Sequence, residues 1–348
     1  MKIWIDILTP KQLVFSEQIL KKIGKRHDVF CTSRHYHEVE KLAKIRDFSL
    51  KIVGSHGGFE KKDKLQSSGI RILKLLPIIT KFSPDLVISF ASPEAARISF
   101  GLGIKHIVFC ASPHASAVMK LTMPLIQKLL IPKIIPKQEF SKFGIDKKDI
   151  ITYNAIDAFV TKQRITNHEN NIPFRKKFRK NILIRIEEEE ASYAKKSNSI
   201  IPIIKIIIEK YQEENIVILT RYQNQVKNLK KLFGKKAEII RMNFDGKILL
   251  EKTDIFIGSG GTMTAESALM GIPTISYNAI PNIIENFLVK KKLVIRETIP
   301  HKVVKQMEMI FKRDKKYWKI KSDKIVNQME DPFEKLIELI KQPQSNFD

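Results

Sequence analysis

The stretch Asp254–Pro273 contains the clearest signal for chemistry in the 348 residues. An apolar run ends in a turn rich in glycine and hydroxyl side chains, and a helical pattern follows. The residues of this turn are Gly258, Ser259, Gly260, Gly261, Thr262 and Thr264. Glycines lack a Cβ, so backbone N–H groups can approach a ligand, and a helix starting here adds N–H donors and the positive end of its dipole. The turn therefore predicts a phosphate or diphosphate site, and Glu266, about one turn later, could bind a ribose diol.

This turn differs from the two commonest nucleotide-binding fingerprints. Met263 stands where the dinucleotide pattern has a third glycine, and the sequence has no Gly-Lys-Ser/Thr of a Walker A motif. A glycine turn that only allows a tight strand–helix connection is the alternative. That alternative would not require Ser259, Thr262 and Thr264 together.

Three residues of the first half are candidates for acid–base chemistry: His56, Glu94 and His114. Each follows an apolar run, and a histidine with a pKa near neutral at the end of a strand could act as a general base. Glu94 also has a structural explanation, because Ser92 and Pro93 before it are typical of a helix start. Both histidines are equally compatible with a structural or exposed position, and Asp6 could orient a ligand or occupy a turn.

Short runs rich in Val, Ile and Phe alternate with amphipathic segments along the chain, which predicts parallel sheets covered by helices on both faces. In the first half the predicted strands are Ile3–Ile7, Asp28–Ser33, Leu50–Gly54, Asp85–Phe90 and His106–Ala111. In the second half they are Ile182–Ile186, Ile216–Thr220, Glu238–Met242, Asp254–Gly258, Pro273–Tyr277 and Leu293–Ile295. The sequence therefore predicts an α/β fold of two Rossmann-like domains that face a cleft, with ligands at the carboxyl ends of the strands.

Prolines punctuate the region from Leu121 to about Lys180, and it is predicted to be irregular. The expected organisation is an N-terminal domain over 1–155, a crossover linker over 156–181, a C-terminal domain over 182–340 and a tail over 341–348. The segment Leu121–Pro136 could pack inside the first domain, or rest on an anionic membrane and receive a lipid-linked acceptor. The carboxylates of Glu187–Glu190 project in different directions, which favours a solvated loop over a metal site.

The composition is that of a globular protein with a large excess of positive charge. There are 62 Lys and Arg against 37 Asp and Glu, a net charge of +25. The excess indicates an anionic partner, or else a bias toward lysine in the composition. The two cysteines, Cys31 and Cys110, lie in apolar runs and are expected in the core. The N-terminus does not resemble a signal peptide and no apolar run is long enough to span a bilayer, so a cytoplasmic protein, at most peripheral to the inner membrane face, is expected.

Several motifs together resemble the mainly archaeal domain-of-unknown-function family 354. They are Gly54-Ser-His56-Gly57-Gly58, Asp85-Leu-Val-Ile-Ser89, Ser92-Pro93-Glu94-Ala95-Ala96-Arg97 with Gly101-Leu-Gly103-Ile, and Gly258-Ser-Gly260-Gly261-Thr262-Met263 with Glu266 and Gly271-Ile-Pro273. That family is similar in turn to UDP-N-acetylglucosamine 2-epimerases and to the peptidoglycan N-acetylglucosaminyltransferase that acts on a polyprenyl-linked acceptor. The resemblance covers residues 1 to about 300.

This resemblance implies the GT-B architecture, with the nucleotide-sugar bound mainly by the second domain and the acceptor by the first. Ser259, Gly260 and Gly261 then meet the diphosphate, and Glu266 meets the ribose hydroxyls. The sequence also departs from its family: Pro113 precedes His114 where an acidic residue is common, and Ala265 precedes Glu266 where arginine is frequent. The catalytic carboxylates of the epimerases are not recoverable position by position, which favours sugar transfer over epimerisation.

The predicted function is a metal-independent glycosyltransferase that needs no cofactor and uses a nucleotide-diphosphate sugar, UDP-linked, as donor. Arg185 or Arg221 would stabilise the leaving diphosphate. His114 or Glu94 would deprotonate the acceptor, and His56 would line the cleft. The alternatives are a UDP-sugar 2-epimerase, a non-catalytic nucleotide-sugar-binding protein and a basic nucleic-acid-binding protein. The last is disfavoured because the sequence contains no recognition motif for RNA or DNA.

Overall fold

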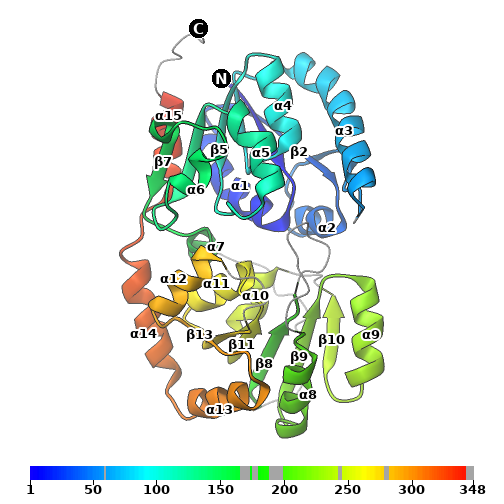
Figure 1. The fold of residues 1–348 in the computed structure, drawn as a ribbon, viewed down its shortest axis with the longest axis vertical. Coiled ribbons are helices and arrows are strands. Elements are labelled where there is room, and N and C mark those ends of the chain that lie inside the picture. Colours follow the sequence, from blue (N-terminus) through cyan, green and yellow to red (C-terminus); the bar gives the residue numbers. More distant parts are fainter. Residues whose placement is uncertain are drawn as a thin grey trace. The chain divides into compact units, whose positions relative to one another are not determined.

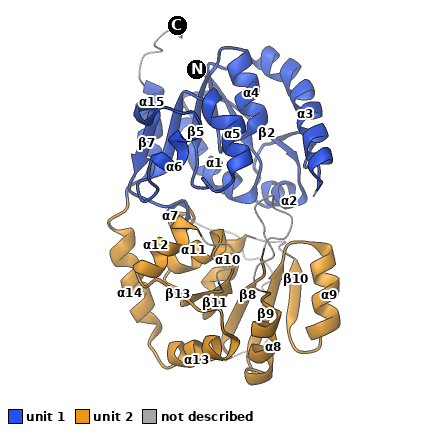
Figure 2. Cartoon of the chain, in the orientation of Figure 1, with its two compact units in different colours: residues 1–160, 330–348 blue, residues 161–329 orange. Residues whose placement is uncertain are grey.

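The computed structural model (Figure 1) describes residues 1–58, 60–164, 173–174, 179–187, 199–241, 245–277 and 282–341. The chain forms two compact units (Figure 2). Unit 1 comprises Met1–Val160 and Glu330–Asp348, and unit 2 comprises Thr161–Met329. Most of the expected tail, three residues of the Glu187–Glu190 run and much of the expected linker lie outside the described residues.

The described part of unit 1 contains a 7-stranded parallel sheet in the order β3-β2-β1-β4-β5-β6-β7. Its strands are β1 (Lys2–Ile7), β2 (Asp28–His35), β3 (Lys51–Ser55), β4 (Leu86–Ser89), β5 (Lys105–Phe109), β6 (Lys128–Pro132) and β7 (Ile150–Tyr153). Its helices are α1 (Pro10–Ile23), α2 (His37–Ile45), α3 (Lys61–Phe82), α4 (Pro93–Gly101), α5 (Ser116–Thr122), α6 (Gln138–Ser141) and α15 (Pro332–Lys341), with the short 3₁₀ turns Met123–Leu125 and Lys147–Asp149. Helix α7 (Ala158–Gln163) lies at the boundary with unit 2.

The five strands predicted in the first half are confirmed as β1 to β5, whereas the prediction of irregular structure from Leu121 to about Lys180 is wrong for the described residues up to Gln163. Strands β6 and β7 lie in that region and extend the sheet. Pro132 is compatible with β6 because it is the last residue of the strand. The side chains of Leu129, Leu130 and Ile131 are completely buried, so the middle of the segment Leu121–Pro136 packs inside unit 1.

The C-terminal helix α15 belongs to unit 1, although the sequence suggested a second domain extending to residue 340. Phe333 of α15 packs against Phe15 of α1, with ring centroids 4.9 Å apart. Lys22 at the end of α1 also forms ion pairs with Asp331 and Glu334. Helix α15 therefore covers aromatic rings of α1 and β5.

The described part of unit 2 contains a 6-stranded parallel sheet in the order β10-β9-β8-β11-β12-β13. The strands, all of them predicted, are β8 (Asn181–Arg185), β9 (Asn215–Thr220), β10 (Glu238–Arg241), β11 (Ile255–Gly258), β12 (Thr274–Ser276) and β13 (Val294–Arg296). The helices are α8 (Ile201–Lys210), α9 (Gln223–Phe233), α10 (Gly246–Glu251), α11 (Thr262–Leu269), α12 (Ile283–Lys290), α13 (Pro300–Phe311) and α14 (Lys315–Val326).

Both faces of this second sheet are buried, as the continuous apolar strands predicted. Along β8, Ile182 and Ile184 belong to a core cluster with helices α8 and α13, while Leu183 between them belongs to a cluster with α10. Successive strand side chains point to opposite faces, so an apolar residue at every position requires helices on both sides. Among the described helices of the protein, none combines the length and hydropathy of a bilayer-crossing segment.

Both cysteines are free and buried, as expected. Burial raises the pKa of Cys31 to about 12 and that of Cys110 to about 11, the negative charge of Asp6 adding to the shift at Cys31. Neither thiol forms an appreciable fraction of thiolate at neutral pH, so both act as small core side chains.

His106 is a completely buried histidine of β5 and gives unit 1 a dependence on pH. Its ring nitrogens lie 2.8 Å from Ser89 Oγ and 3.0 Å from Ser99 Oγ. Burial lowers its pKa from 6.5 to about 3. Between these two pH values the unfolded chain binds a proton that the folded chain does not, so acidification favours unfolding. We expect His106 to reduce the free energy of unfolding by about 1.4 kcal/mol for each pH unit below 6.

Denaturant titrations of wild type and His106→Gln between pH 4 and 7 test this expectation. The variant should lose stability less steeply on acidification, whatever its stability at pH 7. Parallel pH dependences for the two proteins would contradict it.

Candidate functional site

The predicted glycine–hydroxyl turn connects β11 to α11 and has a fixed internal geometry. Gly260 has a φ of 93°, in the left-handed region that favours glycine. Its backbone N–H donates to Thr264 Oγ1 at 3.2 Å, and its carbonyl accepts from Asn282 Nδ2 at 2.9 Å. Thr264 therefore stabilises the turn itself, and its side chain is buried.

The two outer glycines of the turn, Gly258 and Gly261, differ in their surroundings. A Cβ on Gly258 would lie 2.5 Å from the ring of Phe256 and 2.6 Å from Thr264 Oγ1, so the packing alone excludes a side chain there. A Cβ on Gly261 would meet nothing closer than Ser259 Oγ at 3.8 Å. Gly261 and Thr262 are exposed at the start of α11, where the first N–H groups of a helix have no acceptor within the helix. An incoming anion can use those donors.

Two glycine substitutions separate the internal role of the turn from its exposed role. Gly260→Ala should lower the free energy of unfolding by about 1–3 kcal/mol, because alanine is strained at this φ and its Cβ would lie 3.1 Å from Glu285 Cδ. Gly261→Ala should cost less than about 1 kcal/mol, since its φ of −84° suits alanine, the space is open, and only the preference for glycine over alanine at the N-cap is lost. Urea titrations measure both, and equal losses in the two variants would contradict this geometry.

Arg185 and Arg221 lie at the same edge of the sheet as the turn. Strands β9, β8, β11 and β12 are consecutive in the sheet, and their carboxyl ends carry Arg221, Arg185, Ser259 and Tyr277 respectively. Arg185 is buried and donates to the carbonyl of Thr220 at 2.9 Å, so its charge is held in place. The structure therefore brings the predicted arginines and the glycine turn to one edge, as parallel strands require.

Tyr277 is part of this edge and was not singled out from the sequence. Its hydroxyl donates to Glu187 Oε2 at 2.6 Å and also interacts with Ser259. Burial, together with the charge of Glu187, raises its pKa well above 10, so the phenol stays protonated. A protonated phenol remains a hydrogen-bond donor or acceptor next to Ser259, the residue expected to meet a diphosphate.

Glu266 lies one turn into α11 and is half-buried. One of its carboxylate oxygens, Oε1, accepts a hydrogen bond from Thr161 Oγ1 at 2.7 Å. This hydrogen bond fixes the orientation of the carboxylate. The geometry is compatible with the expected contact to a ribose diol.

In unit 1 the structure places His56 near Arg34, and Glu94 near Arg71. The ring of His56 stacks on Tyr36, with centroids 5.2 Å apart. Partial burial and the charges of Arg34 and Lys64 lower the pKa of His56 to about 4, so it is neutral at pH 7. Glu94 is 4% exposed and lies 3.5 Å from Arg71 Nη1 and 3.3 Å from Ser92 Oγ. Its carboxylate is thus held inside a polar network.

Asp6 is the centre of that network and is completely buried. Its two oxygens accept from Arg71 Nη1 at 3.0 Å and Nη2 at 2.5 Å, from Ser92 Oγ at 2.6 Å and from Thr32 Oγ1 at 2.7 Å. Although burial opposes ionisation, the charge of Arg71 and these hydrogen bonds lower the pKa of Asp6. Asp6 therefore fixes the ends of β1 and β2 and the turn after β4, and these contacts already occupy both of its oxygens.

His114 lies elsewhere, after β5, and its side chain is exposed. Partial desolvation and the positive charge of Lys11 lower its pKa. Lys11 forms an ion pair with Asp157 at 2.7 Å. Four strand spacings separate β3 from β5, about 19 Å, so the structure does not bring His56 and His114 into one catalytic group. Of the three candidates, His114 combines exposure with a neutral imidazole.

Ala91, in the turn between β4 and Glu94, has a φ of 57°. Non-glycine residues in this region cost free energy and often mark functional sites. The hydrogen bond from the Ser92 N–H to Ser89 Oγ, 3.3 Å, and the Ser92–Asp6 contact hold this turn. Within the ranges that the structure describes, no three His, Cys, Asp or Glu side chains cluster as a metal site would require.

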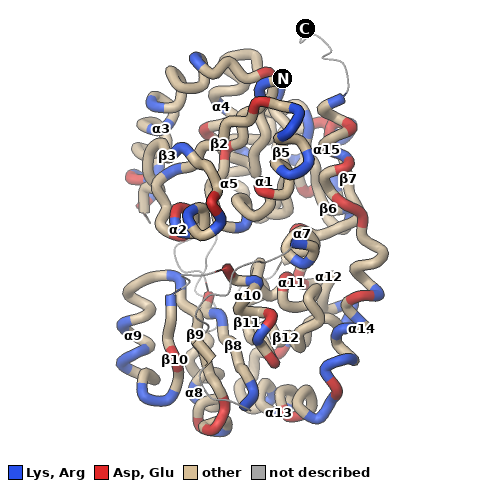
Figure 3. The backbone as a smooth tube through the Cα atoms, turned by 180° about the vertical axis from the view of Figure 1, so that it is seen from behind, with Lys and Arg blue, Asp and Glu red and all other residues tan. Residues whose placement is uncertain are grey.

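Lys and Arg are spread over the helices of both units, with Asp and Glu among them (Figure 3). A dispersed positive charge is typical of a protein with anionic small-molecule ligands or a lysine-rich composition. Nucleic-acid-binding proteins more often concentrate such charge along one stripe or face.

Comparisons with known proteins agree with this fold. An uncharacterised protein of Methanocaldococcus jannaschii, MJ0665, is 27% identical over 318 residues, covering 88% of this chain and 90% of the relative. The UDP-GlcNAc 2-epimerase of the same organism, solved with UDP-GlcNAc and UDP, superposes with a TM-score of 0.70 at 16% identity, covering 98% of this chain and 99% of that one. The spinosyn rhamnosyltransferase SpnG, solved with spinosyn aglycone, gives a TM-score of 0.60 at 10% identity, covering 98% and 100%.

Sequence identities this low establish the fold alone, and the expected GT-B class of two parallel α/β domains is confirmed. Both epimerases and glycosyltransferases share it, so the fold does not choose between the two reactions. The match at the level of sequence is more specific, since a model built for one family aligns with residues 1–343. The chain therefore belongs to the protein family of unknown function DUF354.

Proposed function

We propose that this protein binds a nucleoside-diphosphate sugar, UDP-linked, through the glycine–hydroxyl turn of unit 2 and transfers the sugar to an acceptor. The observation that carries the proposal is the turn itself. Gly260 is left-handed and tightly packed, Gly261 and Thr262 are exposed at the start of α11, and Glu266 follows one turn later. Diphosphate and ribose are the two chemical groups that such an arrangement suits.

We call the carboxyl-terminal edge of the unit 2 sheet, which carries the glycine turn, Arg185 and Arg221, the donor edge. The chemistry that it supplies is electrostatic. As the bond between the sugar C1 and the diphosphate breaks, the electron pair leaves with the UDP. The N–H groups of α11, its dipole and the cation of Arg185 stabilise that negative charge. Arg221 would add a second cation at the same edge.

On unit 1 we assign the general base to His114. An acceptor hydroxyl attacks C1 while its proton moves to the neutral imidazole, whose lowered pKa keeps it unprotonated at neutral pH. Glu94 is less suited, because Arg71 and Ser92 already engage its buried carboxylate. His56 would line the acceptor side as an uncharged ring.

Calorimetric titration with UDP and UDP-sugars tests the donor site. Glu266→Gln should weaken UDP binding about tenfold or more, since hydrogen bonds to a charged group carry more free energy than neutral ones. Glu209→Gln on α8, an exposed glutamate away from the strand ends, is the matched control and should bind as wild type does. Equal affinity for wild type and Glu266→Gln would remove Glu266 from the site, and no binding by wild type would refute the proposal.

Sugar transfer and epimerisation differ in what they require. An epimerase converts the UDP-sugar with no acceptor present, whereas a transferase leaves its configuration at C2 unchanged. Proton NMR of UDP-N-acetylglucosamine incubated with the protein alone distinguishes the two reactions. Formation of the C2 epimer would show that the protein is an epimerase and that our proposal of sugar transfer is wrong.

A further inference from the structure

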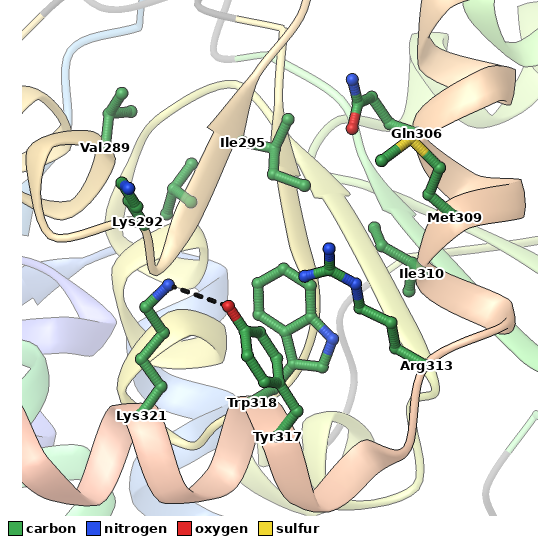
Figure 4. A pocket seen from close by; sticks show the side chains of 11 residues that line it. Val289, Lys292, Ile295, Gln306, Met309, Ile310, Arg313, Tyr317, Trp318 and Lys321 are labelled. Atoms are coloured by element: carbon green, nitrogen blue, oxygen red, sulfur yellow. Dashed lines mark hydrogen bonds between the residues drawn. The ribbon is translucent and has the colours of Figure 1, made fainter.

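Unit 2 contains a cavity of about 280 Å³, bounded by α12, β13, α13 and α14 (Figure 4). Lys292 and Val294, which line it, lie at the beginning of β13, whereas the glycine turn follows the end of β11. Strands β11, β12 and β13 are parallel, so the cavity and the glycine turn lie at opposite ends of these strands. The proposed donor site does not include this cavity.

The inner wall of the cavity is apolar and carries one buried donor without a partner. Ile295 and Ile310 contribute aliphatic surface, and Trp318 is 5% exposed. The indole Nε1 of Trp318 has no hydrogen-bond partner, although a buried tryptophan N–H nearly always has one. In Figure 4 this nitrogen lies on the side of the ring toward Arg313. The atom is shielded from solvent, so a ligand acceptor in the cavity satisfies it only by shifting the adjacent side chains.

The rim of the cavity is cationic. Among the described residues that line it, Lys292, Arg313 and Lys321 are basic and none is acidic. Arg313 Cζ and Lys321 Nζ lie 5.1 Å and 5.3 Å from the ring centroid of Tyr317, and Figure 4 shows them extending on opposite sides of the two aromatic rings. Lys321 Nζ also lies 3.4 Å from the Tyr317 hydroxyl. The hydrogen bond and charge of Lys321, with the charge of Arg313, lower the pKa of that hydroxyl.

The backbone also supports a functional position for Lys292. Lys292 lies two residues after Lys290, the last residue of α12, and has a φ of 55°, a conformation in which glycine is normally favoured. A lysine there costs backbone free energy and gains a cation at the rim. Figure 4 places its side chain on the same side of the cavity as Lys321.

We propose that this cavity binds a phosphate monoester with a compact apolar body. Cations at the rim favour an anionic group, and the planar guanidinium of Arg313 is suited to two oxygens of a phosphate. The aliphatic wall and the indole suit an aromatic or short alkyl group. An apolar cavity of about 150 Å³ already holds benzene, so 280 Å³ accommodates a ring-sized body with part of its headgroup.

Phenyl phosphate is the probe for this site. The chain has two tryptophans, and Trp4 is completely buried in unit 1, so a change in tryptophan fluorescence during a titration reports on Trp318. We expect saturable binding that weakens about tenfold or more in the double variant Arg313→Gln/Lys321→Gln. The matched control, Lys312→Gln/Lys324→Gln, changes two exposed lysines of the same region that do not line the cavity, and it should bind as wild type does.

Phosphorus-31 NMR of the same ligand with Trp318→Phe tests the indole N–H without depending on its fluorescence. The affinity should fall several-fold although the ring is retained. Inorganic phosphate and phenol should each bind at least tenfold more weakly than phenyl phosphate. Equal binding of inorganic phosphate would show an adventitious ion only and overturn the proposal, as would unchanged affinity in the double variant.

Two sources could supply this chemistry, a soluble ester or a lipid headgroup. Binding of phenyl phosphate in the absence of lipid identifies a soluble ester. Cosedimentation with phosphatidic acid vesicles that the double variant loses, without binding of phenyl phosphate, identifies a lipid, and the absence of both would refute the site. UDP should not displace phenyl phosphate, because the proposed UDP site lies at the other end of the strands. Displacement would show that both ligands bind at one site and would overturn the proposal of a separate site.

Discussion

Replacing Arg71 by methionine should lower the free energy of unfolding by about 3–5 kcal/mol at pH 7, the range measured when one partner of a buried ion pair is removed. Arg71 is completely buried, and its guanidinium binds both oxygens of Asp6 and approaches Glu94. Methionine preserves much of the volume and no charge. The variant leaves the carboxylate of Asp6 in a dry environment with only hydroxyl donors.

Protonation of Asp6 sets an upper limit to the stability that the Arg71→Met variant can lose. Asp6 can escape the unpaired state by protonation, and holding a carboxyl with an ordinary pKa near 3.9 neutral at pH 7 costs about 4 kcal/mol. The destabilisation should therefore shrink as the pH falls toward 4. Urea titrations at pH 5 and 7 measure this, with Lys142→Met as the control because its ion pair with Glu139 is exposed. A loss of less than about 1 kcal/mol at pH 7 would show that water reaches Asp6.

Replacing His114 by alanine should lower the rate of the proposed transfer by about 10²–10⁴-fold, the usual contribution of a general base. The residue is exposed on unit 1, and the donor edge lies on unit 2, so UDP affinity and the free energy of unfolding should not change. Because the pKa of His114 is lowered from 6.5, the wild-type rate should rise with pH at acidic pH and level off as the imidazole becomes fully deprotonated. The variant should lose that rise.

The controls for His114 use residues with contrasting surroundings. His301→Ala removes an exposed histidine of α13 and should retain the wild-type rate. Glu94→Gln tests the competing base. If this variant folds and binds UDP but loses transfer, while His114→Ala remains active, the base is Glu94 and our assignment is wrong.

Much of the fold could be predicted because most strands are buried on both faces. Strands such as β4 and β9 read as continuous apolar runs, a pattern that few other elements produce. Strand β6 was missed since it begins with Lys128 and ends with Pro132, two residues that local patterns assign to a loop. The return of α15 to unit 1 depends on Phe333 meeting Phe15, more than three hundred residues away, and no local pattern reports such a contact.

Some residues of the candidate site could also be predicted from the sequence, and others could not. The glycine turn could be predicted because its chemistry lies within a few consecutive residues, and parallel strands bring Arg185 and Arg221 to its edge. Arg71 could not, since it is one basic residue of a long helix and its partner Asp6 is 65 positions away. Tyr277 was missed for a similar reason, because only the sheet places it beside Ser259.

The placement of α15 has a consequence for how this chain acquires its structure during synthesis. Residues 161–329 leave the ribosome before the helix that completes unit 1, so unit 2 has its whole sequence available first. Until Phe333 emerges, the ring of Phe15 and its neighbours on α1 and β5 lack their cover. A nascent chain stalled before residue 330 should thus expose an aromatic surface that chaperones can bind. A fragment that ends at Val160 should aggregate unless α15 is fused to it.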